Sequence, residues 1–321
     1  MQPLLDLPAV HVRPAGVVQV GGPDRLTYLH SLLSQHLEGA AAGSVADFLY
    51  LDAKGNALAE GRAVVRSGDV WLVTPPEVAV DLAAALDRFR FLLQVEVTDR
   101  SAELAVASVR GPLPLEVPGA RSEPMTAVPQ TEGMVVRERE GGVDLVGPRD
   151  WVERRVAALR ADGLAEADAA DWERWRISSG RPAWGSEVTA GRRAQELGLL
   201  PTHVHLRKGC YPGQESIAKI HNLGRPRRAL AVVEFDAPIA PGSTVTTAGT
   251  VATGGSGAAR EAAPRAGEVT SAAPTPAGGV VALALVPLDR DGRLPVEVVG
   301  TGGAHGRVRG RVAEGIAQPG A

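Results

Sequence analysis

The residue types best suited to chemistry gather in one run of eight, 208–215, which reads Lys-Gly-Cys-Tyr-Pro-Gly-Gln-Glu. Cys210 is the only cysteine of the 321 residues, and Lys208 places a cation two positions before it. Pro212 suits the first turn of a helix, where its missing N–H costs nothing, and residues 213–222 then read as a short helix. The sequence therefore places Cys210 at or just before a helix N-terminus. The partial positive charge there and the neighbouring ammonium both favour the thiolate, which is the nucleophilic and metal-binding form of cysteine.

A second interpretation of Cys210 stays open at this point. A lone cysteine in a reducing compartment is commonly a small buried hydrophobe. Glycines on both sides of the Cys-Tyr-Pro unit and polar neighbours along it argue against a buried strand. Composition alone leaves a functional thiol and a packed thiol both open.

The run 208–215 resembles the signature of the YgfZ family, written Lys-Gly-Cys-Tyr-x-Gly-Gln-Glu, and all seven defined positions are present. Lys219, His221 and Gly224 match the basic-x-His…Gly continuation of that family. The family binds folate, is related to the glycine-cleavage T-protein (an aminomethyltransferase), and is linked to assembly or repair of iron–sulfur enzymes and through them to tRNA thiolation. The resemblance implies tetrahydrofolate or a folate derivative as cofactor, iron–sulfur client proteins as partners, and Cys210 with Lys208 as the catalytic residues.

A second segment, 176–187, resembles another motif of the same family, Arg-x-Glu-x-Gly-x-Pro-x-aromatic-Gly-x-acidic. Ser178 stands where the family has a glutamate. In T-proteins a carboxylate in this motif hydrogen-bonds the pterin, and a hydroxyl is a weaker, uncharged substitute. The resemblance implies a cavity in which the flat pterin packs against aromatic side chains. The cofactor-binding residues that it implies are Arg176, Trp184, Glu187, Tyr50, Tyr211, Gln214 and Glu215.

Composition bounds the remaining function classes. A net charge of −3 and a pI near 6.2 give no basic field, so direct binding to nucleic acid is not expected. No apolar run reaches the ~18 residues of a membrane span, and the start of the chain lacks the pattern of a secretory signal. A single cysteine excludes an internal disulfide and disfavours a resident four-thiolate cluster. His203 and His205 share one face but lack a third ligand nearby, so no metal is expected.

The single cysteine fits a reducing compartment, so we expect a cytoplasmic protein.

The first part of the chain alternates strands and helices as an α+β fold does, with helices packed on antiparallel sheets. Three of the strands form a meander, and its first turn, 52–55, resembles the Leu-Asp-x-x-Gly hairpin of the family. For Asp52 and Lys54 individually, an ordinary hairpin turn is the better interpretation. The predicted strands are 17–20, 48–51, 56–65, 70–73, 95–98, 104–109, 134–137 and 143–146. Three helices are predicted to begin after the segments 21–24, 74–77 and 148–150. A fourth helix is predicted at 168–177.

The helix after the meander carries its own start signal. Thr74 is the predicted N-cap, a proline follows it, and Glu77 stands three positions on, which is the pattern of a capping box. The helix then presents one apolar stripe, which consists of Val78, Leu82, Leu86, Phe89 and Leu93.

The composition changes near residue 228, where Gly- and Pro-rich turns begin to separate short strands. We expect a T-protein-like folate-binding region of two α+β lobes at 1–228 and a small β-barrel at 229–321, as T-protein relatives have. The Ala-, Gly- and Pro-rich stretch 252–278 is expected to hold a mobile loop, with 267–271 as a candidate strand inside it.

Three functions stay open. In the first, a folate-dependent factor serves iron–sulfur enzymes, and Cys210 accepts or passes a one-carbon unit or reduces a damaged metal centre. In the second, the chain is an aminomethyltransferase, although residues 71–76 hold no acidic pair where T-proteins carry their key aspartate. In the third, a non-enzymatic scaffold keeps a vestigial folate pocket, which Ser178 favours. Whether any reaction is catalysed is left open by the sequence.

Overall fold

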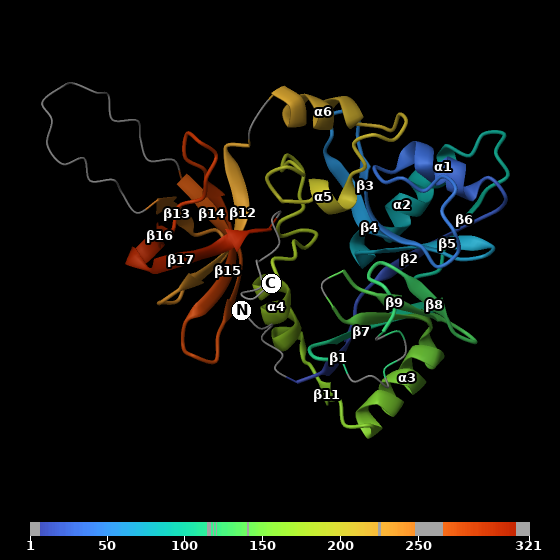
Figure 1. Ribbon diagram of the computed structural model, residues 1–321, viewed down its shortest axis with the longest axis horizontal. Coiled ribbons are helices and arrows are strands. Elements are labelled where there is room, and N and C mark those ends of the chain that lie inside the picture. Colours follow the sequence, from blue (N-terminus) through green and yellow to red (C-terminus); the bar gives the residue numbers. More distant parts are fainter. Residues whose placement is uncertain are drawn as a thin grey trace, which may run out of the picture. The chain divides into compact units, whose positions relative to one another are not determined.

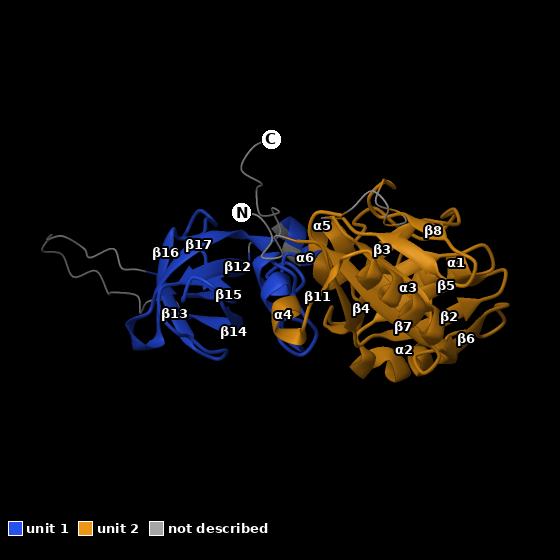
Figure 2. Cartoon of the chain, turned by 90° about the horizontal axis from the view of Figure 1, so that it is seen from below, with its two compact units in different colours: residues 1, 173–199, 219–321 blue, residues 2–172, 200–218 orange. Residues whose placement is uncertain are grey.

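The structure is a computed structural model of the chain (Figure 1), and it describes residues 7–113, 117, 119, 121–139, 141–223, 226–247 and 266–312. The chain divides into two compact units (Figure 2). The sheet unit is Gln2–Trp172 with Leu200–Ala218, and the barrel unit is Glu173–Leu199 with Lys219–Ala321 and Met1. Two sheets in the first unit and a closed barrel in the second, with helices between the strands, confirm the predicted α+β class.

The predicted meander is confirmed in the five-stranded sheet of the sheet unit. β3, β4 and β5 pair in chain order as antiparallel neighbours. β2 continues the sheet beside β5, and β6 forms its edge. The order is therefore β3-β4-β5-β2-β6. The elements are β2 (Gly16–Gly21), α1 (Arg25–Leu32), β3 (Val45–Leu51), β4 (Ala57–Val65), β5 (Asp69–Thr74), α2 (Pro76–Arg88) and β6 (Glu96–Asp99).

The capping box predicted for α2 is wrong. Pro75 is the N-cap residue, and no side chain caps the helix. Thr74 is instead the last residue of β5, and its hydroxyl donates to the backbone oxygen of Glu60 on β4 at 2.6 Å. The Thr74 hydroxyl therefore forms a hydrogen bond within the sheet and does not cap α2.

The apolar stripe of α2 is confirmed for its helical part. Val78, Leu82 and Leu86 are buried. The helix ends at Arg88, so Phe89 and Leu93 lie beyond it and are 45% and 43% exposed.

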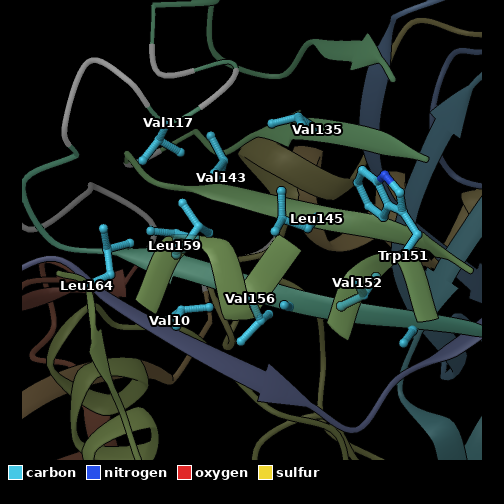
Figure 3. Packing of buried hydrophobic residues seen from close by; sticks show 13 residues of the cluster. Val10, Val117, Val135, Val143, Leu145, Trp151, Val152, Val156, Leu159 and Leu164 are labelled. Carbon is cyan, nitrogen blue, oxygen red and sulfur yellow. The ribbon is translucent and has the colours of Figure 1, made fainter. Parts of the chain in front are cut away.

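A second sheet of the same unit packs on helix α3, and their contact forms a buried apolar core (Figure 3). The helix contributes Val152 and Val156 at i, i+4 spacing. The ring of Trp151 lies where a Cβ on Gly133 or Gly147 would come within 2.8 Å of it, so glycine makes this packing possible. The sheet order is β11-β1-β7-β10-β9-β8. The elements are β1 (Ala9–Arg13), β7 (Leu104–Arg110), β8 (Ala127–Pro129), β9 (Met134–Arg137), β10 (Val143–Pro148), α3 (Arg149–Ala161) and β11 (Ala165–Glu166).

Buried charges join the two sheets of this unit. Arg62 on β4 pairs with Asp47 on β3 at 2.8 Å and contacts Glu138, which follows β9. Arg110 on β7 pairs with Asp144 on β10 at 2.7 Å. Burial opposes the charge of Arg62, but the neighbouring carboxylates outweigh it and raise its pKa. Since a buried charge is tolerated only when paired, removal of one member would destabilise the whole group.

The remaining helices and the barrel complete the described chain. α4 confirms the helix predicted at 168–177, and the barrel closes in the order β12-β15-β14-β13-β16-β17. Residues 252–265 of the expected loop lie outside the described residues. β14 confirms the strand predicted at 267–271. The strand extends to Pro274, so residues 272–274, which were expected to belong to the loop, are part of β14. Among the described residues, no helix is both long and apolar enough to cross a bilayer. The elements are α4 (Ala169–Ser178), α5 (Leu200–His203), α6 (Gln214–Leu223), β12 (Arg228–Phe235), β13 (Thr244–Thr247), β14 (Ala266–Pro274), β15 (Val280–Pro287), β16 (Glu297–Gly300), a 3-10 turn (Thr301–Gly303) and β17 (His305–Arg311).

Candidate functional site

Cys210 is exposed on the surface of the sheet unit. The packed-thiol interpretation is therefore wrong. Helix α6 confirms the predicted helix but begins at Gln214, so three residues separate the thiol from the first helical residue. The helix terminus is thus a weaker source of positive charge for the sulfur than the sequence suggested, because its field falls off within the first turn. Gly224, the expected end of this helix, lies outside the described residues.

Lys208 anchors the segment before Cys210. Its ammonium Nζ donates to the backbone oxygens of His30, Leu33 and Gln35, at and just beyond the C-terminal end of α1. The carbonyl of His30 lies in the last turn of α1, where a helix leaves its carbonyls without intrahelical partners. Three acceptors need three protons on one nitrogen, which only the charged amine supplies. The Lys208 cation is therefore directed at α1 rather than reserved for the thiol.

The surroundings of Lys208 explain its titration. Its Nζ lies 4.8 Å from the centre of the Tyr211 ring, which covers it from a second side. Burial lowers the pKa of Lys208 to about 8. Burial likewise raises the pKa of Tyr211. Lys208 and Tyr211 thus pack against each other within the signature segment.

Gly213 anchors the segment after Cys210. Its φ is +80°, and a Cβ there would lie 2.5 Å from the backbone oxygen of Asp52 and 3.1 Å from the Cα of Gly55. A Cβ on Gly55, whose φ is +78°, would lie 2.9 Å from the Cβ of Ser216 in α6. Both positions therefore require glycine for conformation and for space. The β3–β4 turn thus packs on the start of α6.

The turn itself is fixed by Asp52. One carboxylate oxygen accepts from the backbone N–H groups of Lys54 and Asn56 at 2.8 Å, and the other accepts from the side-chain amide of Asn56. Slight burial would raise the pKa of Asp52, but the bonds from Asn56 and Lys54 outweigh it and lower the pKa. Asp52 is thus a structural residue of an Asx-type turn, as the sequence interpretation favoured.

Glu187 and Arg176 of the second motif form a buried pair within the barrel unit. Glu187 has no exposed surface, and its two oxygens accept from Arg176, from the backbone N–H of Ala183 and from the hydroxyl of Ser271 on β14. Arg176 also donates to Ser271 at 2.7 Å and to Glu173 at 2.6 Å. Both charges are therefore engaged in tying the 181–188 loop to α4 and β14, which is a structural use that the sequence did not reveal.

Ser178 is also satisfied inside its own helix. It is 4% exposed, and its hydroxyl donates to the backbone oxygen of Arg174 at 2.7 Å. Serine and threonine commonly bond the carbonyl four residues earlier in a helix. The proton of this hydroxyl is therefore already used inside α4.

The other expected ligand residues differ in accessibility. Tyr50 and Tyr211 are buried in the sheet unit, at 7% and 8% exposure. Gln214 is half-buried and accepts from the backbone N–H of Tyr211, whereas Glu215 is exposed. Trp184 is half-buried in the barrel unit. Trp184, Gln214 and Glu215 are thus the expected residues whose side chains keep surface for a ligand.

The signature segment also contacts His30, whose backbone oxygen accepts from Lys208 and whose ring lies in a group of three histidines. The ring of His36 lies 4.7 Å from that of His30 and 5.2 Å from that of His205, measured between centroids. Nevertheless, no three His, Cys, Asp or Glu side chains in the described part of the chain are grouped as metal ligands. No sequence motif pointed to His30, because its contact with Lys208 comes from a segment far along the chain.

Comparison with known proteins gives distant relatives. No protein-family model matches the chain. It is 26% identical over 250 residues to the chloroplastic protein At1g60990 of Arabidopsis thaliana, which covers 73% of this chain and 57% of that protein. It is 24% identical over 254 residues to a mitochondrial protein of Cryptococcus neoformans named iron–sulfur cluster assembly factor IBA57 homolog, which covers 70% of this chain and 65% of that protein. The chain thus spans less than two thirds of the length of these curated relatives.

The fold is that of a solved aminomethyltransferase. The glycine cleavage system aminomethyltransferase T of Bartonella henselae matches with a TM-score of 0.77 and 17% identity, over 94% of this chain and 85% of that one. The match spans the sheets and the closed C-terminal barrel. The sequence relatives and this shared fold support the YgfZ and T-protein-like family that the sequence motifs resemble.

Proposed function

We propose that this protein is a tetrahydrofolate-binding factor for assembly or repair of iron–sulfur enzymes, with Cys210 as its reactive group, and that it supports tRNA modification indirectly through those enzymes. The single observation that carries the proposal is the exposed thiol of Cys210 between two fixed points. Lys208 holds one side to α1, and Gly213 holds the other to the β3–β4 turn. Two anchors around an accessible sulfur favour a thiol that reacts over one that packs.

The relatives supply the class of process. One relative is named as an iron–sulfur cluster assembly factor, and the matching fold belongs to an aminomethyltransferase of the glycine cleavage system. A single cysteine cannot supply the four thiolates that a resident cluster usually takes. The proposed role of Cys210 is therefore to act on a metal centre or one-carbon unit that a partner or cofactor brings to it.

The folate part of the proposal rests on the fold and not on the charged residues of the second motif. Glu187 and Arg176 are already bonded to each other, so a pterin would have to be held by other groups. Trp184 offers a flat apolar surface of the kind a pterin stacks on. Trp184→Ala should weaken binding of tetrahydrofolate in a calorimetric titration, while Trp175→Ala, at a buried position, should instead lower stability.

The domain boundary and the location are proposals of the same kind. We propose a folate-binding region at 1–228 and a barrel at 229–321, supported by β12, which begins at Arg228. We also propose action in the cytoplasm, supported by the single cysteine; the two named relatives are chloroplastic and mitochondrial proteins.

One experiment separates this function from its alternatives. The protein is titrated with tetrahydrofolate, and it is also tested for restoring iron–sulfur enzyme activity in cells that lack their own factor. Binding together with restored activity is expected. Restored enzyme activity without binding heat at high micromolar tetrahydrofolate would favour the non-enzymatic scaffold. Failure to restore iron–sulfur enzyme activity would reject the proposal.

An aminomethyltransferase is the second candidate, because the T-protein fold covers 94% of the chain. It predicts methylene-tetrahydrofolate formation from an aminomethyl-lipoyl carrier protein. Turnover in that assay would favour it, and absence of turnover with restored iron–sulfur enzyme activity would favour the first proposal.

A further inference from the structure

The side chain of His30, in α1, has its proton position fixed by the backbone. Its Nδ1 accepts from the N–H of Glu38 at 3.2 Å and from the N–H of Leu37 at 3.4 Å. A ring nitrogen that accepts must be unprotonated, so the proton of the neutral ring is on Nε2. Nε2 is consequently a hydrogen-bond donor and not a base.

This donor lies beside the signature segment. Apart from the two chain neighbours of Gly209, Nε2 of His30 is the nearest heavy atom to the point where a Cβ on Gly209 would stand, at 3.8 Å. Gly209 and Cys210 are both exposed. The backbone oxygen of His30 also accepts from Lys208, so the histidine and the segment are held together. In the described part of the chain, no hydrogen-bond partner of Nε2 is found.

The groups around His30 keep it neutral. Burial lowers its pKa first, and the charges of Lys208, His36 and His205 lower it further, while only Glu38 acts in the opposite direction. Protonation would also turn Nδ1 into a donor that faces two backbone donors. At neutral pH the ring therefore presents an uncharged N–H beside Gly209.

We propose that His30 is a further functional residue of the Cys210 site, and that its Nε2–H donates a hydrogen bond to the thiolate or to the electron-rich oxygen of a group delivered to that sulfur. This inference rests on the proposed role of Cys210. The absence of a side chain at Gly209 leaves the path from Nε2 to that group open. A hydrogen bond from a neutral donor stabilises negative charge on its acceptor, so His30 would assist a reaction at the sulfur.

A matched pair of substitutions separates the two ring nitrogens. His30→Asn keeps an acceptor near the position of Nδ1 and removes the donor, whereas His30→Gln places an amide N–H near the position of Nε2. Gly209→Ala adds a methyl group at ordinary contact distance from Nε2, with no strain from φ, and so screens the donor without removing it. His305→Asn, at an exposed position in the barrel, is the control for the substitution itself.

The readout is the alkylation rate of the folded protein by iodoacetamide, which reports Cys210 alone because it is the only cysteine. We expect His30→Asn and Gly209→Ala to slow alkylation several-fold at neutral pH, His30→Gln to restore most of the rate, and His305→Asn to leave it unchanged. Thermal unfolding is measured for each variant, so that a lost fold is not read as a lost donor.

Two results would overturn the inference. One is an unchanged rate in folded His30→Asn, and the other is equal slowing by Asn and Gln, which would indicate a structural role. A second measurement, the activity of iron–sulfur enzymes in cells that depend on this protein, separates failure of the His30 role from failure of the proposed function. If Cys210→Ala loses support while His30→Asn keeps both rate and support, only the role of His30 fails; if Cys210→Ala keeps support, the proposed function fails.

Discussion

Gly55 and Gly213 meet backbone to backbone, since a Cβ on Gly213 would lie only 3.1 Å from the Cα of Gly55. The contact joins the β3–β4 turn to the segment that carries Cys210. Both glycines have positive φ, and each has a protein atom where its side chain would be. The β3–β4 turn and the Cys210 segment, which are far apart in the chain, therefore pack against each other.

The first prediction concerns this contact. Gly213→Ala should destabilise the protein by about 1–3 kcal/mol, since it combines a strained φ with a Cβ 2.5 Å from a backbone oxygen. Urea unfolding measures the loss. Gly68→Ala, in the neighbouring turn with open space around it, is the control and should change little. Equal stability of both variants would show that the contact is not required.

The second prediction concerns the anchor at Lys208. Lys208→Met should cost about 1–3 kcal/mol, because it leaves backbone oxygens of the α1 end without their donor. Lys208→Arg should not restore stability, because a planar guanidinium cannot aim three N–H groups as an ammonium does. Lys219→Met, at an exposed position on α6, controls for loss of a lysine. Full stability of Lys208→Met in urea unfolding would contradict the anchor.

The third prediction concerns the buried pair of the barrel unit. Burial opposes the charge of Arg176, but Glu173 and Glu187 outweigh it and raise its pKa. Glu187→Ala should destabilise the protein by about 3–5 kcal/mol, because it leaves the arginine with an unpaired side in a buried place. Asp150→Ala removes one of two partners of the exposed Arg154, which keeps Glu132, and should cost less than about 1 kcal/mol. Similar effects of both substitutions on thermal unfolding would show that Glu187 is not a structural residue.

The fourth prediction concerns acid pH. The pKa of His30 is lowered in the folded state, so the unfolded chain binds the proton first as pH falls below the ordinary value of 6.5. The free energy of unfolding should therefore decrease from about pH 6.5 downward until the folded state also takes up the proton. The comparison is unfolding free energy between pH 7.5 and 5 in the wild type and in His30→Asn. The variant should lose less stability over this range, and parallel curves would show that His30 does not contribute.

Much of the fold follows from local pattern, and the meander, α2, α3 and α6 were predicted because apolar period and turns agree there. The cap of α2 was missed because Thr74 bonds across the sheet to Glu60, a choice that depends on tertiary pairing. The structural roles of Lys208 and Glu187 could not be predicted from the sequence, because they also depend on tertiary contacts. Their partners, such as His30 and Ser271, stand in elements that only the folded chain brings together.

The most direct test of the account is support of an iron–sulfur enzyme in cells whose only factor is wild-type protein or Cys210→Ala, at matched protein levels and with thermal unfolding checked. Loss of enzyme activity to the level of cells without the factor, with an intact fold, is the predicted result. Activity equal to that with the wild type would show that the sulfur is not needed.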